Sequence, residues 1–399
     1  MNGLYRAGHA AWRMLPRALR RRAMTGFAAA LARRPDPVPP AASNGVVVAG
    51  DTLNANGLAE SARIMHQVIA EHGLARGFIP LGLPGNVPEN PAPVPEDAAL
   101  LAVVNANILP IGLLRLPRRF IARRRVIGMW AWELPLVPPS WVEGARFVHE
   151  IWAPSRFTAD ALEALAPGRV RVVPYPLAAV VLPVAGGRAD FGLPEGMVVV
   201  LTVFNLASSM VRKNPMGAIA AFRAAFGDSR EHLLVLKLSA TEAYTDDLRE
   251  IQAAIGNAPN IRLMTQTLPE AALRGLIAAA DIVLSLHRSE GFGLIPATAM
   301  LLGRAVIATG WSGNLAFMTP ECAALVSHRL VPVVDPRGTY DLPGARWADP
   351  DIEDAAQQLR RLAGDAPARE ALAQAGLAYA RGVLGAAPVL RALAANGIA

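Results

Sequence analysis

The sequence predicts an α/β protein that contains two Rossmann-like, doubly wound parallel sheets in series. Short runs of apolar and β-branched residues alternate with helical segments from residue 45 onward, which is typical of parallel sheets covered by helices on both faces. The runs form two sets, separated by a loop-like stretch at 182–192. The length of 399 residues also favours two domains over one.

The predicted strands lie between helical segments at 58–72, 215–226, 269–280 and 294–303. Those of the first set are VVVAG (46–50), LAVVNAN (101–107), RVIGMW (125–130), HEIWAP (149–154) and VRVVPY (170–175). Those of the second are MVVVLTVF (197–204), LLVLKL (233–238), IRLMTQ (261–266), DIVLSL (281–286) and AVIAT (305–309). Because ligands of such sheets bind beyond the carboxyl ends of the strands, the loops that follow these runs are the predicted sites of chemistry.

These patterns divide the chain into four segments. We expect a basic amphipathic arm at 1–34, a first Rossmann-like domain at 35–186 and a second one at 187–365. The Ala/Leu-rich segment 366–399 is predicted to be helical and to pack back on the first domain.

Composition limits the class of protein. Hydrophobic residues make up 53% of the chain and charged residues 18%, which excludes a disordered protein. The single cysteine, Cys322, has no partner within the chain for a disulfide, as expected for a reducing cytoplasm. No apolar run approaches the roughly 20 residues of a membrane-spanning helix, and the N-terminus lacks the apolar core of a signal peptide.

The net charge of +7 is concentrated at the N-terminus. Residues 1–34 contain eight arginines and no acidic residue, so the remaining chain is nearly neutral, and a nucleic-acid partner is not expected. After Pro16 a helix is predicted, with arginines opposite an apolar face formed by Leu19, Ala23, Phe27 and Ala30. This pattern indicates a peripheral helix at an anionic membrane surface. The alternative is a helix that packs on the body of the protein with its arginines in solvent.

The most informative loop follows the run DIVLSL. Here Glu290 precedes Gly291, Phe292, Gly293 and Leu294, at the start of a predicted helix. Glycines allow backbone N–H groups to approach a phosphate or a sugar, and the N-terminus of a helix favours an anion. The carboxylate of Glu290 is a candidate acceptor for sugar hydroxyls. By itself this motif is weak evidence, because acidic residues also cap helices.

A second loop follows the first strand of the second set. Asn205 lies at the end of this strand, and Arg212 and Lys213 precede a helix that begins near Pro215. A guanidinium and an ammonium group side by side suit a diphosphate, and could stabilise a departing nucleoside diphosphate. The alternative is an exposed basic pair, but the position at the carboxyl end of a strand favours a binding role.

Together these segments resemble a known family. RKNPMGAIAAF, followed about eighty residues later by SLHRSEGFGLIPATAM and AVIATGWSGN, is similar to the donor half of GT-B glycosyltransferases of family 4, the large retaining family. NGLAESAR (56–63), with Gly57, resembles the glycine-containing loop near the donor phosphates. IGMWAWELP (127–135) and EIWAPSRFTADAL (150–162) resemble segments of bacterial cell-surface polysaccharide transferases in this family.

The resemblance implies roles for matching residues and also shows one departure. In this family the residues at the positions of Arg212 and Lys213 hold the diphosphate, and the one at Glu290 binds the donor sugar. The second glutamate of the family pattern is replaced here by Thr298. Threonine cannot hold the ribose hydroxyls in a bidentate manner, so we expect donor affinity to be weaker by about 1.5–4 kcal/mol. The departure also leaves an inactive relative as an alternative.

The acceptor side is predicted from the first set of strands. Trp130, Trp132 and Glu133 follow one strand and are expected to face the cleft, where aromatic rings stack on sugars and a carboxylate orients a hydroxyl. Core packing is the alternative for the tryptophans. His149 and His287 are candidates for substrate contact, with a structural role as the alternative. The basic stretch RRFIARRRV (118–126) suits a lipid diphosphate or an anionic membrane, or forms a solvated helix face.

The sequence therefore predicts an enzyme that transfers a hexose from a nucleotide-diphosphate sugar to a saccharide or polyprenol-diphosphate-linked acceptor. No cofactor or metal is expected, and the D-x-D sequence Asp349-Pro-Asp351 is interpreted as a helix start. The expected location is the cytoplasm, at the inner face of the membrane, in exopolysaccharide or lipopolysaccharide synthesis. The alternatives are a nucleotide-sugar epimerase or hydrolase of the same fold and a non-catalytic binding protein.

Overall fold

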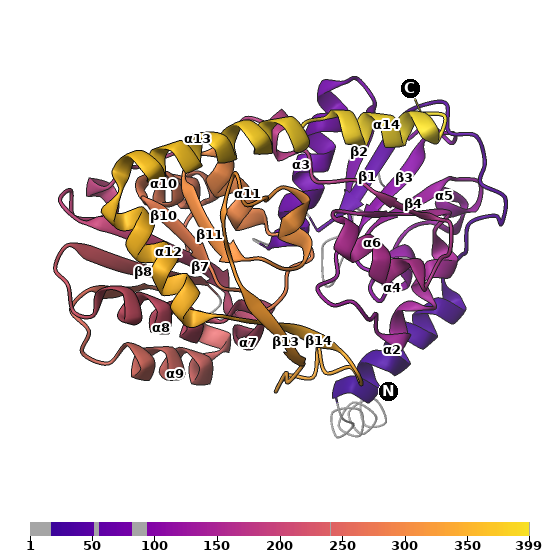
Figure 1. Cartoon of the computed structure of the whole chain (residues 1–399). Helices are drawn as coiled ribbons and strands as arrows, with labels where there is room; N and C mark the ends of the chain where they lie inside the picture. Colours follow the sequence, from indigo (N-terminus) through magenta and orange to yellow (C-terminus); the bar gives the residue numbers. More distant parts are fainter. Residues whose placement is uncertain (1–16, 52–55, 82–93, 240, 399) are drawn as a thin grey trace.

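Two parallel six-stranded sheets form the frame of the chain (Figure 1). The structure is a computed structural model and describes residues 17–51, 56–81, 94–239 and 241–398. Residues 1–16 of the predicted arm lie outside the described residues. The predicted α/β class with two Rossmann-like sheets is confirmed. All ten predicted runs form strands. Most of these strands are buried under helices on both faces, whereas Val170–Val172 is largely exposed.

The first sheet has the strand order β2-β1-β3-β4-β5-β6, and every adjacent pair is parallel. Its strands are β1 (Val46–Gly50), β2 (Ala75–Pro80), β3 (Ala99–Val103), β4 (Val126–Met129), β5 (Glu150–Ala153) and β6 (Val170–Val172). The connecting helices are α3 (Gly57–Glu71), α4 (Leu109–Leu113), α5 (Arg118–Ala122) and α6 (Arg156–Glu163). The edge strand β2 was not predicted, because its sequence ARGFIP contains Arg76 and Gly77 and lacks a continuous apolar run.

The second sheet has the order β12-β11-β10-β7-β8-β9, which is the dinucleotide-fold order 3-2-1-4-5-6 read from the other edge. Its strands are β7 (Val198–Asn205), β8 (His232–Ser239), β9 (Ile261–Met264), β10 (Ile282–Ser285), β11 (Ala305–Thr309) and β12 (Ala324–Val326). The helices are α7 (Met210–Lys213), α8 (Pro215–Phe226), α9 (Thr245–Ile255), α10 (Glu270–Ala279), α11 (Leu294–Leu301) and α12 (Ile352–Gly364). The order reverses between β7 and β10, so the loops after these two strands meet at the ligand-binding edge.

The last two helices cross from the second sheet to the first (Figure 1). Helix α13 (Ala366–Val383) packs on α11 and β11, whereas α14 (Ala387–Ala395) lies over the first sheet. The side chain of Asn396 follows α14 and hydrogen-bonds to Arg125 and Glu150 at 2.8 Å each. A backbone hydrogen bond of 2.9 Å joins Leu384 to Ala178.

This helical stretch also bears on the membrane prediction. By length and composition alone, Ala366–Ala395 is apolar and long enough to cross a membrane, so the prediction that the chain has no such stretch was wrong by this criterion. Its side chains Ala380, Leu384, Val389 and Leu393 are nevertheless buried in the core that both sheets share. Although only 28% of the most apolar window of this stretch is buried, these contacts place α13 and α14 against the rest of the molecule.

Helix α2 (Arg17–Leu31) packs on α4 at one side of the first sheet. Thr25, Ala28 and Ala29 are buried, whereas Met24, Phe27 and Leu31 are 43%, 68% and 47% exposed. The helix therefore packs on the body through its small residues and keeps an apolar stripe in solvent. The proline-rich stretch that follows runs along the first sheet without regular structure, and the carbonyl groups of Asp36 and Pro40 accept hydrogen bonds from His149 and Arg125.

An antiparallel hairpin of β13 (His328–Pro332) and β14 (Arg346–Pro350) was not predicted. It leaves the second sheet and reaches toward the first half of the chain (Figure 1). Val333, Tyr340 and Trp347 belong to the same buried cluster as Trp132 and Trp141 of the first half. The hairpin loop therefore completes a core that begins two hundred residues earlier.

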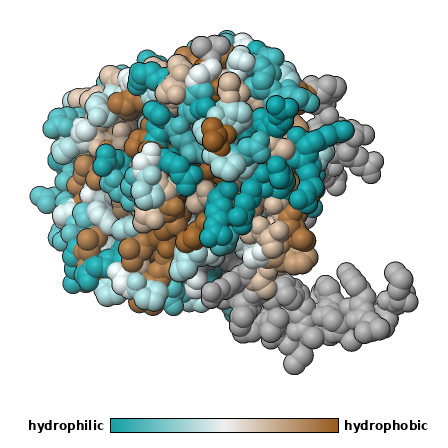
Figure 2. All heavy atoms as spheres, turned by 90° about the vertical axis from the view of Figure 1, so that its right-hand side faces the viewer, coloured by the Kyte–Doolittle hydropathy of each residue, from teal (hydrophilic) through white to brown (hydrophobic). Residues whose placement is uncertain are grey.

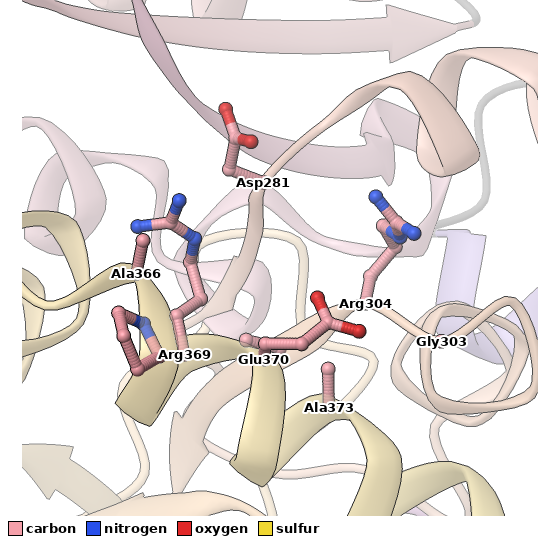
Figure 3. Close-up of a pocket in the computed structure, with 9 residues that line it drawn as sticks. Asp281, Gly303, Arg304, Ala366, Arg369, Glu370 and Ala373 are labelled. Atoms are coloured by element: carbon pink, nitrogen blue, oxygen red, sulfur yellow. The ribbon is translucent and has the colours of Figure 1, made fainter.

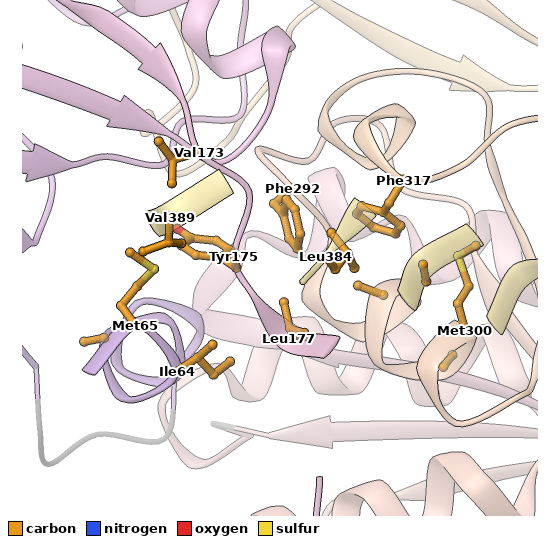
Figure 4. Close-up of a cluster of buried hydrophobic side chains, with 14 of the residues drawn as sticks. Ile64, Met65, Val173, Tyr175, Leu177, Phe292, Met300, Phe317, Leu384 and Val389 are labelled. Atoms are coloured by element: carbon orange, nitrogen blue, oxygen red, sulfur yellow. The ribbon is translucent and has the colours of Figure 1, made fainter. Parts of the chain in front are cut away.

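A second apolar cluster joins the two halves on the opposite side of this contact (Figure 4). Tyr175 and Leu177 of the first half lie near Phe292 and Phe317 of the second, together with Leu384 and Val389 of the C-terminal helical stretch. The ring centroids of Tyr175 and Phe292 are 5.0 Å apart, and those of Phe292 and Phe317 are 4.9 Å apart. The carboxyl edges of the two sheets are thus held together by apolar packing.

Candidate active site at the meeting edges of the two sheets

The loop after β7 carries both predicted cations on one short helical turn. Ser209 begins α7 with a φ of 72°, and Asn214 ends it with a φ of 53°. Backbone conformations with positive φ are unfavourable for side chains other than glycine and concentrate at functional sites. The Asn214 side chain is held by Leu286 O at 2.9 Å and caps α8 through Gly217 N at 3.1 Å. These contacts fix Arg212 and Lys213 at the end of β7.

The loop after β10 places Glu290 opposite these cations. The backbone N–H of Glu290 donates to Ser312 Oγ at 2.9 Å, and its carbonyl accepts from Gly313 N at 2.8 Å. A Cβ atom at Gly313 would lie 2.1 Å from Gly291 O, so glycine is required for the two loops to touch. Gly293 begins α11 with a φ of 100°. The strand-loop-helix arrangement thus presents Glu290 at the junction of β7 and β10.

The three side chains form one ionic cluster. Lys213 Nζ bonds directly to Glu290 Oε1, and Arg212 Nη1 is 3.3 Å from Glu290 Oε2. Burial alone would raise the pKa of Glu290, but Lys213 and Arg212 outweigh that effect and lower the pKa to about 2. Burial lowers the pKa of Lys213, although Glu290 opposes the shift. The site therefore holds an ionised carboxylate between two cations.

The two cations differ in accessibility. The side chain of Arg212 is 3% exposed, and its guanidinium donates to Ser289 O at 2.7 Å and to Ser208 O at 3.2 Å. It also lies 5.3 Å from the ring centre of Tyr340. The side chain of Lys213 is 21% exposed. Arg212 is thus enclosed by protein, and Lys213 is the cation that a ligand can reach directly.

A carboxylate from the first half completes the cluster. Glu133 follows β4, and its Oε1 is 3.8 Å from Arg212 Nη2. Ser289 Oγ donates a hydrogen bond to the Glu133 carbonyl. Burial raises the pKa of Glu133, and the neighbouring Glu290 charge adds to this, whereas Arg212 and Lys213 oppose it. The carboxyl ends of β4 and β10 therefore meet at one site.

Helix α6 of the first half clamps the Glu290 loop. Ser155 Oγ donates to Gly291 O at 2.6 Å, and Thr158 Oγ1 is within hydrogen-bond distance of Gly291 O (3.0 Å) and Trp132 O (2.9 Å). Sequence reasoning did not single out Ser155 and Thr158, because such residues at a helix start are ordinary caps. A Cβ atom at Gly291 would lie 2.9 Å from Trp132 O. Gly291 thus allows the two halves to approach, which is a reason for glycine that the sequence did not reveal.

The predicted acceptor residues are only partly brought to this site. Trp130 and Trp132 are 0% and 5% exposed and pack on Trp141 in the core of the first half. The prediction that their rings stack on an acceptor is wrong, because neither ring is accessible and the core-packing alternative holds. His149 precedes β5, at the edge of the sheet away from the site, and its ring nitrogens bond to Val126 N and Asp36 O. His149 is therefore structural.

Several predicted donor residues lie near Glu290 but serve the framework. The Phe292 ring is buried between the halves, so only its backbone is available to a ligand at this predicted donor-binding position. His287 is 1% exposed and is bonded to Ser285 and Asn314, and burial lowers its pKa. The His287 ring therefore holds the loop that contains Ser312 and Asn314, and it is not exposed for contact with a ligand. Asn205 caps the turn after β7 by accepting from Ala207 N at 2.8 Å.

The remaining predicted residues lie on helices that border the site. Gly57 begins α3, and a Cβ atom there would lie 3.4 Å from Leu294 Cδ1 at the start of α11. The start of α3 therefore lies against the start of α11. Thr298 is half-buried on α11. Asp349 pairs with Arg288 and Arg329, and Asp351 caps α12, as expected for a helix start.

The described residues contain no group of three or more His, Cys, Asp or Glu side chains arranged to hold a metal. A cavity of about 380 Å³ lies at the amino-terminal edge of the second sheet, beside α13 (Figure 3). It is lined by acidic and basic side chains, among them Asp281, Arg304 and Glu370. Because it lies at the opposite edge of the sheet from Glu290, it does not belong to the same site.

Comparison of the whole structure with solved structures reveals the fold. HepE from Anabaena, in complex with UDP and glucose, superposes with a TM-score of 0.63 at 14% identity, covering 88% of this chain and 98% of that one. Sucrose-phosphate synthase from Thermosynechococcus elongatus gives 0.64 at 16% identity, covering 87% and 97%. The lipopolysaccharide glycosyltransferase WaaG gives 0.54 at 15% identity, covering 88% and 99%.

The chain has the GT-B fold. No family model and no curated protein sequence matches it. The solved structures are similar in fold over nearly their full lengths, and some of them contain UDP or UDP-glucose. In this GT-B chain, Lys213 and Glu290 lie where the edges of both Rossmann-like sheets meet.

Proposed function

We propose that this GT-B protein is a retaining glycosyltransferase of family 4 that moves a hexose from a nucleotide-diphosphate sugar to a saccharide or lipid-linked saccharide. The observation that carries the proposal is the convergence of Lys213, Arg212 and Glu290 at the junction of β7 and β10, with Glu133 opposite. The retaining course and the family assignment come from the motif resemblance. The UDP-glucose bound by a protein of similar fold supports a nucleotide sugar as donor.

The charges of the site suit the chemistry of such a transfer. Breaking the bond between the sugar C1 and the diphosphate oxygen leaves negative charge on the diphosphate. Lys213 is the accessible cation that would neutralise this charge, so we propose that no metal ion is needed. Arg212, which is enclosed by protein, holds the Glu290 carboxylate in its orientation. When a diphosphate draws Lys213 away, the ionised Glu290 becomes available to accept hydrogen bonds from sugar hydroxyls.

The first experiment is a thermal-shift panel with UDP-glucose, UDP-galactose, UDP-N-acetylglucosamine and GDP-mannose. A donor that binds the folded chain raises the melting temperature in proportion to its occupancy. We expect one of these donors to stabilise the protein, and to release its nucleotide slowly to water and faster with a membrane extract that contains acceptor. If none binds at millimolar concentration, the proposed function is wrong.

Thr298 separates this proposal from a non-catalytic binding protein. We expect Thr298→Glu to tighten UDP binding by about tenfold or more, since one charge-assisted hydrogen bond contributes about 1.5–3 kcal/mol. If the protein is an enzyme, Thr298→Glu also converts the donor, including at donor concentrations below saturation. In a binding protein it binds more tightly without any turnover. An epimerase or hydrolase would convert the donor at full rate without acceptor.

The surface beside α2 supports an acceptor held at an anionic membrane in the cytoplasm. Met24, Phe27 and Leu31 form an exposed apolar stripe on α2. Three exposed arginines of the stretch 118–126 lie around α5: Arg118, Arg119 and Arg123. Figure 2 views the molecule from the side on which α2 and α5 lie, and shows hydrophobic and strongly hydrophilic side chains next to each other. An apolar stripe with nearby cations suits anionic lipid.

Arg124 and Arg125 of the same basic stretch have a different role. Arg124 is buried and donates to the carbonyl groups of Pro95 and Ala98, and Arg125 bonds to Pro40 O and Asn396. Only part of the basic stretch 118–126 is therefore available to bind lipid.

A flotation assay tests the membrane proposal. We expect the full chain to bind vesicles of phosphatidylglycerol and phosphatidylcholine, and Phe27→Ser to weaken this binding several-fold. Val181→Ser is the matched control, because Val181 is an exposed apolar residue (78% exposed) in the segment between β6 and β7 and is not part of the α2 stripe. Equal binding by both variants would refute a role for the α2 stripe, and equal binding to pure phosphatidylcholine would refute recognition of anionic lipid.

A further inference from the structure

Lys237 is a buried cation that the proposed transfer step does not use. It belongs to β8 and is 3% exposed, and its ammonium donates a hydrogen bond of 2.6 Å to the carbonyl of Leu238. Among the described residues no carboxylate pairs with it, so burial lowers its pKa and no charged group opposes the shift. Lysine is almost never fully buried without a partner, because its charged form loses hydration. The ammonium therefore keeps donor capacity for a group that the described residues do not supply.

Lysine occurs at only two positions of the chain. They are Lys213 and Lys237, although the chain contains 39 lysine and arginine residues. Lys213 lies on α7, the helical turn after β7, and Lys237 lies near the carboxyl end of β8, which pairs with β7. Arginine would offer a larger, planar group, whereas lysine offers a compact ammonium that donates and cannot accept. Both lysines thus lie at the edge of the sheet where the donor is proposed to bind.

Lys237 lies on the face of the second sheet that α10 and α11 cover. It is paired in register with Val203 of β7 and Met264 of β9, and side chains at paired positions point to the same face. Met264 packs in a core cluster that includes residues of α10 and α11. The ammonium reaches toward the carboxyl edge, because its acceptor, the carbonyl of Leu238, lies one residue nearer to that edge.

The proposed donor complex directs the nucleobase toward Lys237. In that complex the sugar lies at Glu290 and the diphosphate at Lys213, and the loop of Glu290 leads into α11. Thr298, at the position where the motif resemblance implies a ribose contact, lies on this helix. Strand β8 is two strands away from β10, or about 10 Å across the sheet. A base attached to a ribose at α11 would therefore lie over the ends of β7 and β8, within reach of Lys237.

We propose that Lys237 selects the nucleobase of the donor by donating a hydrogen bond to its exocyclic carbonyl oxygen. This inference rests on the proposed function. The matching acceptors are O4 of uracil and O6 of guanine, whereas cytosine and adenine carry an amino group at the corresponding position. An ammonium has three donors and no acceptor, so an amino group placed against it finds no partner. The protein should therefore bind uridine or guanosine diphosphates and reject cytidine and adenosine diphosphates.

The test compares UDP with CDP, which differ only along one edge of the base. Isothermal titration calorimetry with the full-length protein measures both dissociation constants, and GDP and ADP form a second pair. In at least one pair, we expect the nucleotide with the carbonyl group to bind about 10- to 100-fold more tightly than its amino counterpart. The wrong base leaves the buried ammonium unpaired, and such sites discriminate strongly between similar ligands.

Two substitutions of Lys237 test its role directly. Lys237→Met keeps the length of the side chain and removes its donors, so the two Kd values should become nearly equal, mainly through weaker binding of the nucleotide with the carbonyl group. Lys237→Gln offers both a donor and an acceptor, so it should also bind the amino nucleotide. Lys213→Met is the matched control. It removes the other lysine, which faces the diphosphate that all four nucleotides share, so it should weaken both members of a pair and preserve their ratio.

Melting temperatures show whether the variants fold. Lys237→Met should melt at or above the temperature of the wild-type protein, because it removes a buried charge that has no acidic partner. A clearly lower melting temperature would mean that the ammonium is satisfied within the protein, and would contradict a role in binding the base.

The outcomes separate the two proposals. If the wild-type protein binds the members of a pair equally, or if Lys237→Met keeps the wild-type preference, Lys237 does not select the base and the proposed function stands. If Lys237→Met weakens both members alike, the ammonium binds the diphosphate or the ribose, and the assignment to the base is wrong. If the wild-type protein binds none of the four nucleotides, the proposed function fails and this inference with it.

Discussion

Arg212 and Glu133 form an ion pair between the two halves of the chain, with Nη2 and Oε1 separated by 3.8 Å. The same guanidinium lies 3.3 Å from the carboxylate of Glu290, which belongs to its own half. One buried cation thus stands between two carboxylates of different origin. Because Arg212 is nearly enclosed, its position couples the acceptor side of the site to the donor side.

Lys213 should determine nucleotide affinity. We expect Lys213→Met to weaken UDP binding by about 10- to 100-fold, because it removes one charge-assisted hydrogen bond of about 1.5–3 kcal/mol to the diphosphate. Isothermal titration calorimetry with UDP measures the change. Arg249→Ala removes an exposed cation of the same half, paired with Asp246, and serves as the control. Equal affinity in Lys213→Met would show that the diphosphate binds elsewhere.

Glu290 should stabilise the fold at neutral pH. Its pKa of about 2 in the folded state lies below the ordinary value near 4.3, so the folded state favours the ionised form. This stability is fully present above about pH 5 and is lost as the pH falls toward 2. We expect Glu290→Gln to lower the free energy of unfolding at pH 7 by on the order of 3 kcal/mol. Urea titrations at several pH values should show the difference shrinking with acidification.

The control for Glu290→Gln is Asp349→Asn, which removes a more exposed carboxylate from its pair with Arg288. Surface pairs contribute about 0–1 kcal/mol, so this variant should lose much less stability. A loss as large as that in Glu290→Gln would mean that burial between Lys213 and Arg212 is not what stabilises the carboxylate.

Glu133 should have the opposite effect on stability. Its pKa in the folded state is raised, chiefly by burial, so the folded protein holds this proton more tightly than the unfolded chain does. Stability is therefore lost as the pH rises through the interval above the ordinary pKa near 4.3. We expect Glu133→Gln to have a higher melting temperature than wild-type protein at pH 8, and no advantage at pH 4.

Thermal melting curves of wild-type protein and Glu133→Gln between pH 4 and pH 8 test this prediction. A variant that is less stable than wild-type protein at pH 8 would indicate that the attraction to Arg212 exceeds the cost of burying the charge. A stabilising variant that also lacks activity would identify Glu133 as a residue retained for function at the expense of stability.

Gly291 should be necessary for the contact between the halves. An added Cβ atom would lie 2.9 Å from Trp132 O and 3.2 Å from Trp132 N, so the loop or the Trp132 segment must move. We expect Gly291→Ala to lower the free energy of unfolding by about 1–3 kcal/mol, as overpacking does. Small-angle scattering should show a larger radius of gyration. Gly187→Ala, where no atom lies within 4 Å of the added Cβ, should change neither quantity.

Much of the frame could be predicted from local pattern. The runs around β7 and β10 are continuous and apolar, because both faces of a parallel strand are buried, and the glycine and proline positions mark the loops between them. The edge strand β2 and the hairpin of β13 and β14 lack such runs, because an edge or surface strand buries only part of its residues. They were missed for that reason.

The candidate site could be predicted only in part. Lys213 and Glu290 follow strand ends, where side chains of parallel sheets gather, and so both were identified. Tyr340 lies in an irregular loop, and no local pattern connects it to Arg212, whose guanidinium lies 5.3 Å from its ring centre. Trp130 and Trp132 were misassigned because an aromatic residue after a strand has the same local sequence whether it faces a cleft or a core.

The sequence by itself determined the two-sheet class, the order of strands and helices along the chain, and the loops in which charged residues would gather. These depend on hydrophobic periodicity and on turn residues, which act over a few positions. Only the tertiary structure decided that Glu133 and Arg212 share an ion pair, that Gly291 is small in order to admit Trp132, and that Phe292 belongs to the core. Such contacts depend on the packing of segments more than seventy residues apart, and neither local pattern nor composition encodes the distances involved.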